Sequence, residues 1–389
     1  MIVRALRQWW TGTNDKQLFD AQERLLKTFV RAPLVSVAKR HGMNVAEFTN
    51  DRSSGTPTAT EPPTVVLLHG YGSGLGFFFR NIDPLLDSGR VGRVLLVDWL
   101  GMGGSDRPYC RRPIRGLSDC TTAWCQSRFN PSQAVDFFLD PLHQLFQEEI
   151  GENESTWLVG HSLGGYLVAR YALQHSTAGN SAGSTINMEK VILASPVGFP
   201  SKPTNLLPSA QMPTAIRLVD ALWSANVTPQ QLVRMMGATR GRNAVRRALA
   251  GRIPQLAAGD SDDHVLEILA NYLFHITAAH PSGEFAINSL LEPGMSPDIA
   301  GVFAREPLEP LFQEYAQRQH TRQESKLHWK VLYGDHDWMR PNEPSARKAL
   351  SYLSQQSNSN DVASISIVPN AGHHLYLDNA ESFARHILQ

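Results

Sequence analysis

Cysteine is scarce in this sequence of 389 residues, which contains only Cys110, Cys120 and Cys125. An odd and sparse set argues against a disulfide scaffold and favours a reducing compartment. The three cysteines cluster, but no histidine lies between them at zinc-finger spacing. We therefore expect ordinary thiols and no structural metal.

The sequence also lacks a net charge, because 36 lysines and arginines balance 36 aspartates and glutamates. This balance gives no global reason to expect a nucleic-acid partner. No apolar run approaches the ~20 residues of a membrane span. Since 42% of the residues are apolar and 19% are charged, we expect a folded protein that is soluble or lies on a membrane surface.

A nucleotide-binding signature is missing as well. The glycine-rich segments HGYGSGLG (69–76) and GMGGSDRP (101–108) lack the lysine of a phosphate-binding loop. Asp98 has roughly the position of a ribose-binding acid, but no clean G-x-G-x-x-G motif opens a helix here. The sequence therefore predicts no nucleotide site.

Short apolar runs alternate with helix-like segments along most of the chain. The runs cover 64–70, 93–99, 156–162, 190–196, 328–335 and the stretch that begins at 364. This alternation predicts an α/β fold with a mainly parallel sheet and helices on both faces. Chemistry in such a fold gathers at the carboxyl ends of the strands.

The expected organisation has four parts. Residues 1–60 form an N-terminal amphipathic segment and the entry to the sheet, and 61–199 form the first part of the core. Residues 200–325 are helix-rich without clear strands, so we expect an inserted helical cap. Residues 326–389 complete the core.

One motif points to a nucleophile. Gly160, His161, Ser162, Leu163 and Gly164 fit G-x-S-x-G, after a strand-like run and before a helix-like one. In this context the serine sits on a sharp turn that demands small residues two positions before and after it. Ser162 is therefore the candidate nucleophile.

A serine nucleophile needs a base and an acid. After a G-x-S-x-G turn in an α/β sheet, the acid comes next along the chain and the histidine last. The last strand-like run is followed by His373 and His374, and we favour His373 because it directly follows a glycine. The preceding run is followed by Asp335 and Asp337. We favour Asp337 as the acid and expect Asp335 to form a turn.

The oxyanion of an acyl-transfer intermediate needs two backbone N–H donors. We expect one from Leu163, the residue after the nucleophile, and the other from Tyr71 in the glycine-rich loop after residues 64–70.

Motifs along nearly the whole chain resemble one subgroup of α/β-hydrolases. They are LLHGYGSGLGFFFRNIDPLL, VDWLGMGGSDRP, GHSLGGYLVARYAL, SPVGFP, HPSGEFAINSLL, YGDHDWM and AGHHLYLDN. The subgroup contains eukaryotic lipid-acting proteins related to lysophosphatidic acid acyltransferases, N-acyl-phospholipid lipases and fungal cardiolipin-specific deacylases. The resemblance implies the α/β-hydrolase fold with the triad Ser162, Asp337 and His373. One departure is Val197, where relatives usually carry an aromatic residue.

The resemblance also implies an H-x-x-x-x-D pattern, here His373 and Asp378, which has been linked to acyl transfer in this subgroup. We prefer a simpler interpretation, in which His373 is the triad base and Asp378 caps the final helix. Asn379 is the alternative cap.

Three functions are compatible with these residues. The leading hypothesis is a serine hydrolase that cleaves an acyl ester of a membrane phospholipid or lysophospholipid and needs no metal or organic cofactor. The second is a lysophosphatidic acid acyltransferase that uses the same site. The third is a non-catalytic lipid-binding regulator of a lipase.

The first residues suggest contact with a membrane. Ile2, Leu6, Trp9 and Trp10 share one helical face, and the first acidic residue is Asp15. This pattern suits an interfacial anchor or a mitochondrial transit peptide. The alternative is a helix that packs its tryptophans against the domain.

Arginines supply the second membrane signal. Six of them, without an acidic residue among them, lie in the expected cap: Arg234, Arg240, Arg242, Arg246, Arg247 and Arg252. A second run contains Arg107, Arg111, Arg112 and Arg115. We expect peripheral binding to anionic membranes; a solvated basic face is the alternative. The predicted location is intracellular, with mitochondria favoured over lipid droplets and cytosol.

Overall fold

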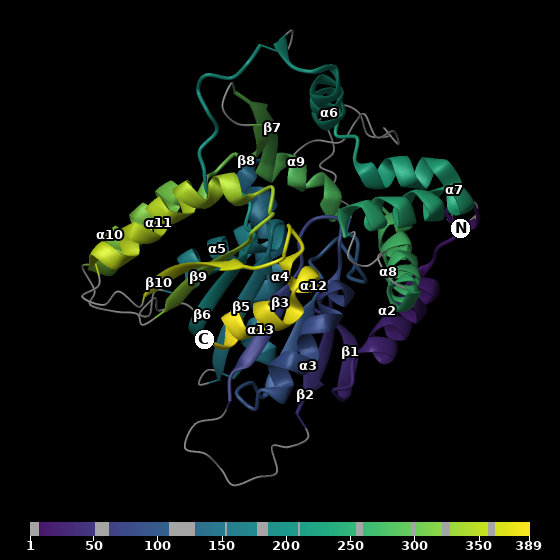
Figure 1. The fold of residues 1–389 in the computed structure, drawn as a ribbon, viewed down its shortest axis with the longest axis horizontal. Coiled ribbons are helices and arrows are strands. Elements are labelled where there is room, and N and C mark those ends of the chain that lie inside the picture. The colour runs from purple at the N-terminus through teal and green to yellow at the C-terminus, as the bar shows by residue number, and fades with distance from the viewer. Residues whose placement is uncertain are drawn as a thin grey trace.

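The computed structural model describes residues 8–50, 62–108, 129–151, 154–176, 186–208, 211–253, 260–296, 300–320, 327–356 and 362–389. A twisted sheet runs through the middle of the molecule, and helices pack on both of its faces (Figure 1). Further helices and a small hairpin lie above one end of the strands.

The main sheet has eight strands in the order β1-β2-β4-β3-β5-β6-β9-β10. Their bounds are β1 Leu34–Arg40, β2 Met43–Thr49, β3 Thr64–Leu68, β4 Arg93–Val97, β5 Ser155–His161, β6 Asn187–Ala194, β9 His328–Gly334 and β10 Ala363–Val368. Only β2 runs against the other strands, since it pairs antiparallel with both β1 and β4. The mainly parallel sheet predicted from the apolar runs is confirmed.

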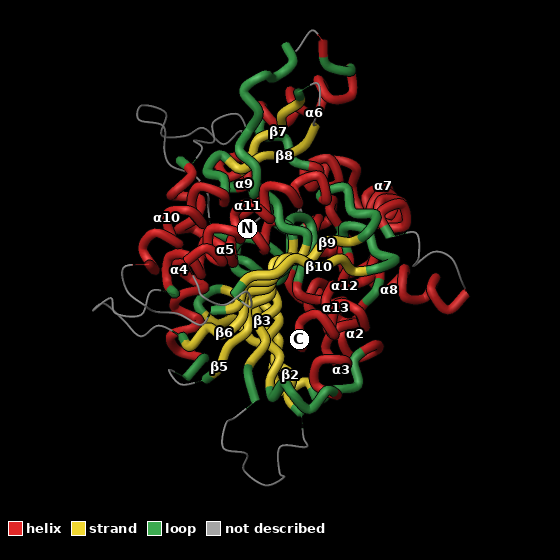
Figure 2. Tube along the Cα trace, turned by 60° about the vertical axis from the view of Figure 1, so that its left-hand side comes forward, coloured by secondary structure: helices red, strands yellow, loops and turns green. Residues whose placement is uncertain are grey.

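Both faces of the sheet are buried, which explains why its strands read as continuous apolar runs. Along β3, Val65 and Leu67 belong to one apolar cluster and Val66 and Leu68 to the other. Figure 2 shows the sheet between two layers of helices. One layer contains α4 (Pro131–Glu149), α5 (Leu163–His175), α10 (Leu308–His320) and α11 (Glu343–Gln356), and the other contains α2 (Asp15–Phe29), α3 (Phe79–Asp87), α8 (Asp260–Ala278), α12 (Leu375–Asp378) and α13 (Ala380–Leu388).

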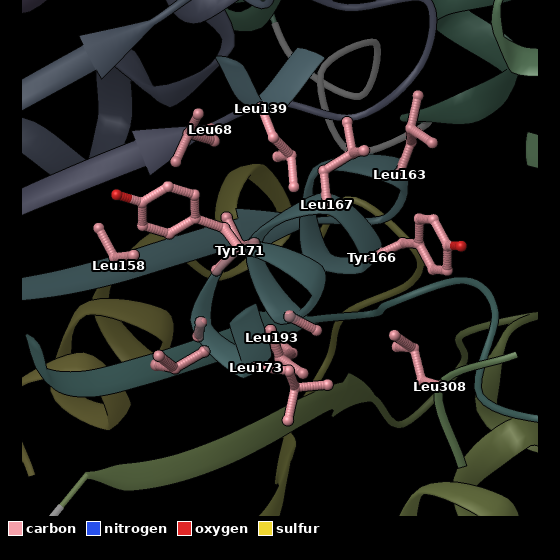
Figure 3. Close-up of a cluster of buried hydrophobic side chains, with 14 of the residues drawn as sticks. Leu68, Leu139, Leu158, Leu163, Tyr166, Leu167, Tyr171, Leu173, Leu193 and Leu308 are labelled. Atoms are coloured by element: carbon pink, nitrogen blue, oxygen red, sulfur yellow. The ribbon is translucent and has the colours of Figure 1, made fainter. Parts of the chain in front are cut away.

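Helix α5 fixes the site on the sheet because it begins directly after Ser162 and is buried along most of its length. Leu167 and Tyr171 of α5 pack among Leu158 of β5, Leu193 of β6 and Leu139 of α4 (Figure 3). The position of the turn between β5 and α5 therefore depends on a fully packed core.

The upper part of the molecule contains helices α6 (Thr214–Ser224) and α7 (Pro229–Arg252), a short 3-10 turn η6 (Gly283–Phe285), and α9 (Ile287–Leu290). It also contains an antiparallel hairpin of β7 (Leu291–Met295) and β8 (Ala300–Ala304). The expectation that 200–325 lacks strands is thus wrong. These strands carry proline, glycine and alanine rather than a β-branched run, so sequence pattern gave little sign of them.

Helix α10 also departs from the predicted cap. Its Phe312 packs against Trp329 of β9 and Phe199, so α10 covers the sheet rather than the site. Two strands near the N-terminus, β1 and β2, lie in the segment that was predicted only as an entry to the sheet, because polar residues such as Ser36, Asn44 and Glu47 interrupt their apolar residues.

Candidate active site

The sharp turn between β5 and α5 carries Ser162. This residue has φ 54° and ψ −114°, a left-handed φ that costs energy for a residue with a side chain. The flanking glycines are required by close backbone contacts. A Cβ at Gly160 would lie 2.4 Å from Gly164 O, and one at Gly164 would lie 2.5 Å from His69 O. The turn therefore lifts the serine above the sheet as the motif predicts.

The structure brings the three predicted residues together at the carboxyl ends of their strands. His373 Nε2 lies 3.2 Å from Ser162 Oγ, and His373 Nδ1 lies 3.2 Å from Asp337 Oδ1. Asp337 follows β9, and His373 follows β10. This is the nucleophile, base and acid arrangement of a serine hydrolase triad.

The acid is buried and ionised. Burial alone would raise the pKa of Asp337, but hydrogen bonds from His373 and Ser195 and the N–H of Met339 outweigh it and hold the pKa below its usual value. A carboxylate that stays charged in this position stabilises an imidazolium at His373.

Ser195 is a residue of the site that sequence reasoning missed. It directly follows β6, and its hydroxyl hydrogen-bonds both Asp337 Oδ2 and His373 Nδ1, the latter at 2.6 Å. Its place at the carboxyl end of a parallel strand is the signal that could have identified it.

Trp338 was missed too. Its ring lies 4.9 Å from that of His373, although 59% of the tryptophan remains exposed. The indole therefore covers one side of the His373 ring at the edge of the site.

Side chains from distant parts of the sequence hold the backbone around His373. Asp335 accepts hydrogen bonds from the N–H groups of Asn370 and Ala371, each at 2.9 Å. His161 Nε2 lies 2.8 Å from the carbonyl oxygen of His373. Asp335 lies in a turn, as predicted, and its carboxylate also fixes the loop that carries the histidine.

Asp378 belongs to the same set of contacts. Its Oδ2 accepts a hydrogen bond from Gly372 N at 2.9 Å, directly before His373. The prediction that Asp378 caps the final helix is wrong, because Asn379 is the N-cap of α13 and accepts from Ser382 N. A cap is a local feature that several residues near a helix start can supply, so sequence alone could not choose between them.

His374, the alternative base, points into the core instead. Its Nδ1 lies 3.0 Å from Tyr376 Oη, and its ring packs near that of Phe77. Burial, together with the nearby His373, lowers the pKa of His374 to about 3. His374 is therefore a neutral imidazole that packs beside the site.

The predicted oxyanion donors lie beside the serine. Leu163 is the first residue of α5, and the Ser162 side chain makes no capping hydrogen bond to that helix. A Cβ at Gly70 would lie 2.9 Å from Ser162 Cβ, so the loop that contains Tyr71 passes close to the nucleophile. The Tyr71 hydroxyl donates to Gln230 Oε1 of α7 at 2.6 Å, which connects this loop to the upper helices.

Asp98 shapes the same loop and has no free oxygen for a ribose. It accepts hydrogen bonds from Leu75 N at 2.6 Å, Gly104 N at 2.8 Å and Asn44 Nδ2 at 2.7 Å. A Cβ at Gly103 would lie within 2.3 Å of this carboxylate, which explains the glycine. Asp98 therefore anchors the loop that leads from Tyr71 to α3.

Several arginines predicted to face a membrane have partners inside the protein. Arg234 is buried in a two-fold ion pair with Glu284, and Arg246 pairs with Asp263 and Glu267 of α8. The side chain of Arg107 donates to carbonyl groups, including that of Gly103 at 2.7 Å.

The other predicted arginines differ in exposure. Arg242 bonds Asn271 Oδ1 and lies over the ring of Phe274, whereas Arg240, Arg247 and Arg252 are exposed. Arg111, Arg112 and Arg115 lie outside the described residues. The acids of α8 thus neutralise part of the charge, a contact that local sequence cannot reveal.

The predicted N-terminal apolar face is only partly described, since Ile2 and Leu6 lie outside the described residues. Trp10 packs against Gly237, where α7 is kinked, and donates to Arg234 O at 2.9 Å. Trp9 is 79% exposed. One tryptophan therefore packs on the domain, and its neighbour faces outward.

Within the described ranges, no group of three or more histidines, cysteines and acids is arranged to hold a metal ion. The three cysteines lie outside those ranges. The described helices include none that is long and apolar enough to cross a bilayer.

Comparison with known proteins identifies the fold family. A family model described as "alpha/beta hydrolase fold" matches residues 63–380. The chain is 30% identical over 399 residues to a rice protein named "Probable 1-acylglycerol-3-phosphate O-acyltransferase", covering 96% of this chain and 80% of the relative. It is 26% identical over 376 residues to the human "(Lyso)-N-acylphosphatidylethanolamine lipase", and the alignment covers 95% of this chain and 90% of that relative.

A solved bromoperoxidase from Bacillus anthracis shares the fold, with a TM-score of 0.53 and 19% identity over 91% of this chain and 98% of that one. At this identity the likeness concerns the fold alone.

Proposed function

This chain belongs to the α/β-hydrolase fold family, and we propose that it is a serine hydrolase that removes an acyl group from a membrane phospholipid or lysophospholipid. The observation that carries the proposal is the alignment of Ser162, His373 and Asp337 on a strained turn beside uncapped backbone N–H groups. The names of the relatives, which include a lipid acyltransferase and a phospholipid lipase, support the substrate class.

The proposed reaction uses groups of this chain alone. Ser162 Oγ attacks the ester carbonyl carbon, and its proton passes to His373 Nε2. The N–H groups of Leu163 and Tyr71 stabilise the oxyanion. The leaving alcohol takes the proton from His373, and water, activated by the same imidazole, then hydrolyses the acyl-enzyme.

A fluorophosphonate probe tests this proposal directly, since labelling requires an activated hydroxyl. We expect the full-length protein to be labelled and Ser162→Ala to lose labelling and at least 10³-fold in ester turnover, as triad losses do. Ser176→Ala, at the other end of α5, is the matched control and should keep both. Unchanged turnover in Ser162→Ala would refute the proposal.

A second candidate, acyl transfer to a lysophospholipid, is supported by the printed name of the rice relative. It uses the same acyl-enzyme, with a lipid hydroxyl in place of water. Incubation with a labelled acyl donor and lysophosphatidic acid separates the two reactions. Release of free fatty acid alone would exclude transfer under those conditions.

We further propose that the enzyme binds peripherally to anionic membranes. Trp9 is 79% exposed and Met235 of α7 is 72% exposed, and Arg240 and Arg247 follow on the same helix. Exposed aromatic and flexible apolar side chains suit the headgroup region, and arginines add salt-sensitive attraction. An intracellular, preferentially mitochondrial location remains a proposal that cell fractionation would test.

Vesicle flotation tests the membrane proposal. Binding should rise with phosphatidic acid or cardiolipin, fall with salt, and weaken in Trp9→Ala, in Met235→Ser and in a variant with Arg240 and Arg247 changed to glutamine. The control is Val35→Ser, because Val35 is 55% exposed on the edge strand β1. Equal binding to neutral and anionic vesicles at low salt would contradict the electrostatic part.

A further inference from the structure

We infer that Ser195 is a positioning residue of the proposed site, a fully buried hydroxyl that acts on catalysis through His373 and Asp337. The inference rests on the proposed function and adds a residue to it. Ser195 contacts the acid and the base of the triad, and it lies on the Nδ1 side of the imidazole, opposite the nucleophile.

The hydrogen-bond geometry assigns a direction to each contact. Asp337 is ionised and accepts only, so the Ser195 hydroxyl donates its proton to Asp337 Oδ2. Its lone pair then faces His373 Nδ1 at 2.6 Å, whereas Asp337 Oδ1 lies 3.2 Å from the same nitrogen. The Nδ1–H of His373 therefore has two acceptors, and the serine oxygen is the nearer one.

The backbone of Ser195 has a conformation that is energetically unfavourable for a residue with a side chain. Ser195 has φ 48°, in the left-handed region, and its N–H donates to Leu332 O of β9 at 2.7 Å. Strained residues persist where the surrounding structure requires them, and they concentrate at functional sites. The strain here turns the hydroxyl from the end of β6 towards the neighbouring strand that leads to Asp337.

The consequence for catalysis follows from electrostatics. When Ser162 loses its proton, His373 becomes an imidazolium, and the negative end of the Ser195 hydroxyl dipole stabilises that charge. Removing the hydroxyl should lower kcat by roughly 10- to 100-fold, the range expected for one hydrogen bond to a charged group. KM should stay unchanged, because the buried side chain lies behind the histidine.

The pH profile gives a further expectation. The other titratable groups around His373 are Asp337, His161, His374 and Asp378, and all of them remain in the variant. Loss of the hydroxyl dipole makes protonation of the imidazole less favourable. The acidic limb of kcat/KM should therefore move to lower pH.

The experiment compares Ser195→Ala with the wild type on a soluble ester substrate, with thermal melts to verify folding. Thr156→Val is the matched control. It removes a buried hydroxyl near the start of β5, at the end of that strand that lies away from Ser162. If Ser195→Ala fails to fold, Ser195→Gly also removes the hydroxyl and tolerates the positive φ. We expect the kcat loss and the shifted limb in the Ser195 variant only.

Three outcomes would overturn the inference: kcat within two-fold of wild type, an equal loss in Thr156→Val, or a change confined to KM. A proton NMR spectrum tests the role of Ser195 without a measurement of enzyme activity. The His373 Nδ1–H resonance, identified by its absence in His373→Gln, should shift in Ser195→Ala and not in Thr156→Val. If wild type is not labelled at Ser162, the proposed function fails, and this resonance alone decides the role of Ser195.

Discussion

His373 is held at its backbone as well as at its ring. Hydrogen bonds to Asp335, Asp378 and His161 fix the chain from Asn370 to His373 itself. A histidine placed this way needs little reorganisation when a substrate binds, which is how enzymes lower the barrier of an acyl transfer. In the H-x-x-x-x-D pattern of this protein, the aspartate supports the loop that carries the histidine.

A comparison of two Asp378 variants tests this relation. Asp378→Asn keeps an oxygen that can accept from Gly372 N and should retain most activity, whereas Asp378→Ala should lose about 10-fold or more, the value of a hydrogen bond to a charged group. Hydrolysis and any acyl transfer, measured in the same assay, should fall by the same factor. A selective loss of transfer would show that Asp378 serves that reaction alone.

The glycines of the turn provide a steric prediction. A Cβ at Gly164 would approach the carbonyl oxygens of Leu68 and His69 to 2.6 Å and 2.5 Å. Gly164→Ala should therefore lower the free energy of unfolding by about 1–3 kcal/mol and displace Ser162. The control is Gly251→Ala on α7, where no atom lies within 4 Å and helix propensity favours alanine. Urea denaturation of both variants measures the difference; equal stabilities would contradict the steric argument.

At the scale of elements, α7 and the turn η6 are joined by a buried ion pair. Arg234 and Glu284 are each 6% exposed, and Thr228 at the start of α7 also donates to Glu284. In the first turn of α7, Gln230 accepts a hydrogen bond from the hydroxyl of Tyr71. The upper helices and the loop that contains Tyr71 are thus connected through the first two turns of α7.

Removing one partner of this ion pair should destabilise the fold. Arg234→Met leaves a buried carboxylate without its cation and should lower the free energy of unfolding by about 3–5 kcal/mol. The double variant with Glu284→Leu should be less destabilised than the single one, because no buried charge remains. Chemical denaturation of the set measures this, and a double variant weaker than Arg234→Met would show that the charge itself is not the cause.

At the scale of the whole molecule, several histidines are buried in a neutral form. Burial and the neighbouring Arg242 lower the pKa of His275 to about 4, and burial with the nearby His373 lowers that of His374 to about 3. Burial also holds the pKa of His161 well below 6.5. Each of these side chains takes up a proton more readily in the unfolded chain than in the folded one.

Stability should therefore fall with acid over a defined range. The unfolded chain gains protons as pH falls through 6.5, while His275 and His374 stay neutral in the fold until about 4 and about 3. Each contributes a loss of up to about 1.4 kcal/mol per pH unit between those limits. Urea denaturation at pH 7.5 and pH 5 should show the loss, and His374→Gln should reduce it. An identical pH dependence in that variant would contradict the role of His374.

Sequence alone determined the features of this protein that depend on local pattern. The apolar runs predicted the parallel sheet because both faces of each central strand are buried. The glycines around Ser162 predicted the turn because backbone atoms lie where their side chains would be. The order of strands predicted which two loops would bring a histidine and an aspartate to the serine, since parallel strands end at one edge.

Tertiary structure decided what depends on contacts between distant segments. It placed Ser195 between the acid and the base, it directed Asp378 to Gly372, and it enclosed Arg234 in an ion pair with a residue fifty positions away. Such contacts leave no periodic trace, because a hydroxyl or a guanidinium has many partners that are compatible with its local sequence. Packing selects among them only when the whole core forms, and that selection fixes the geometry around His373.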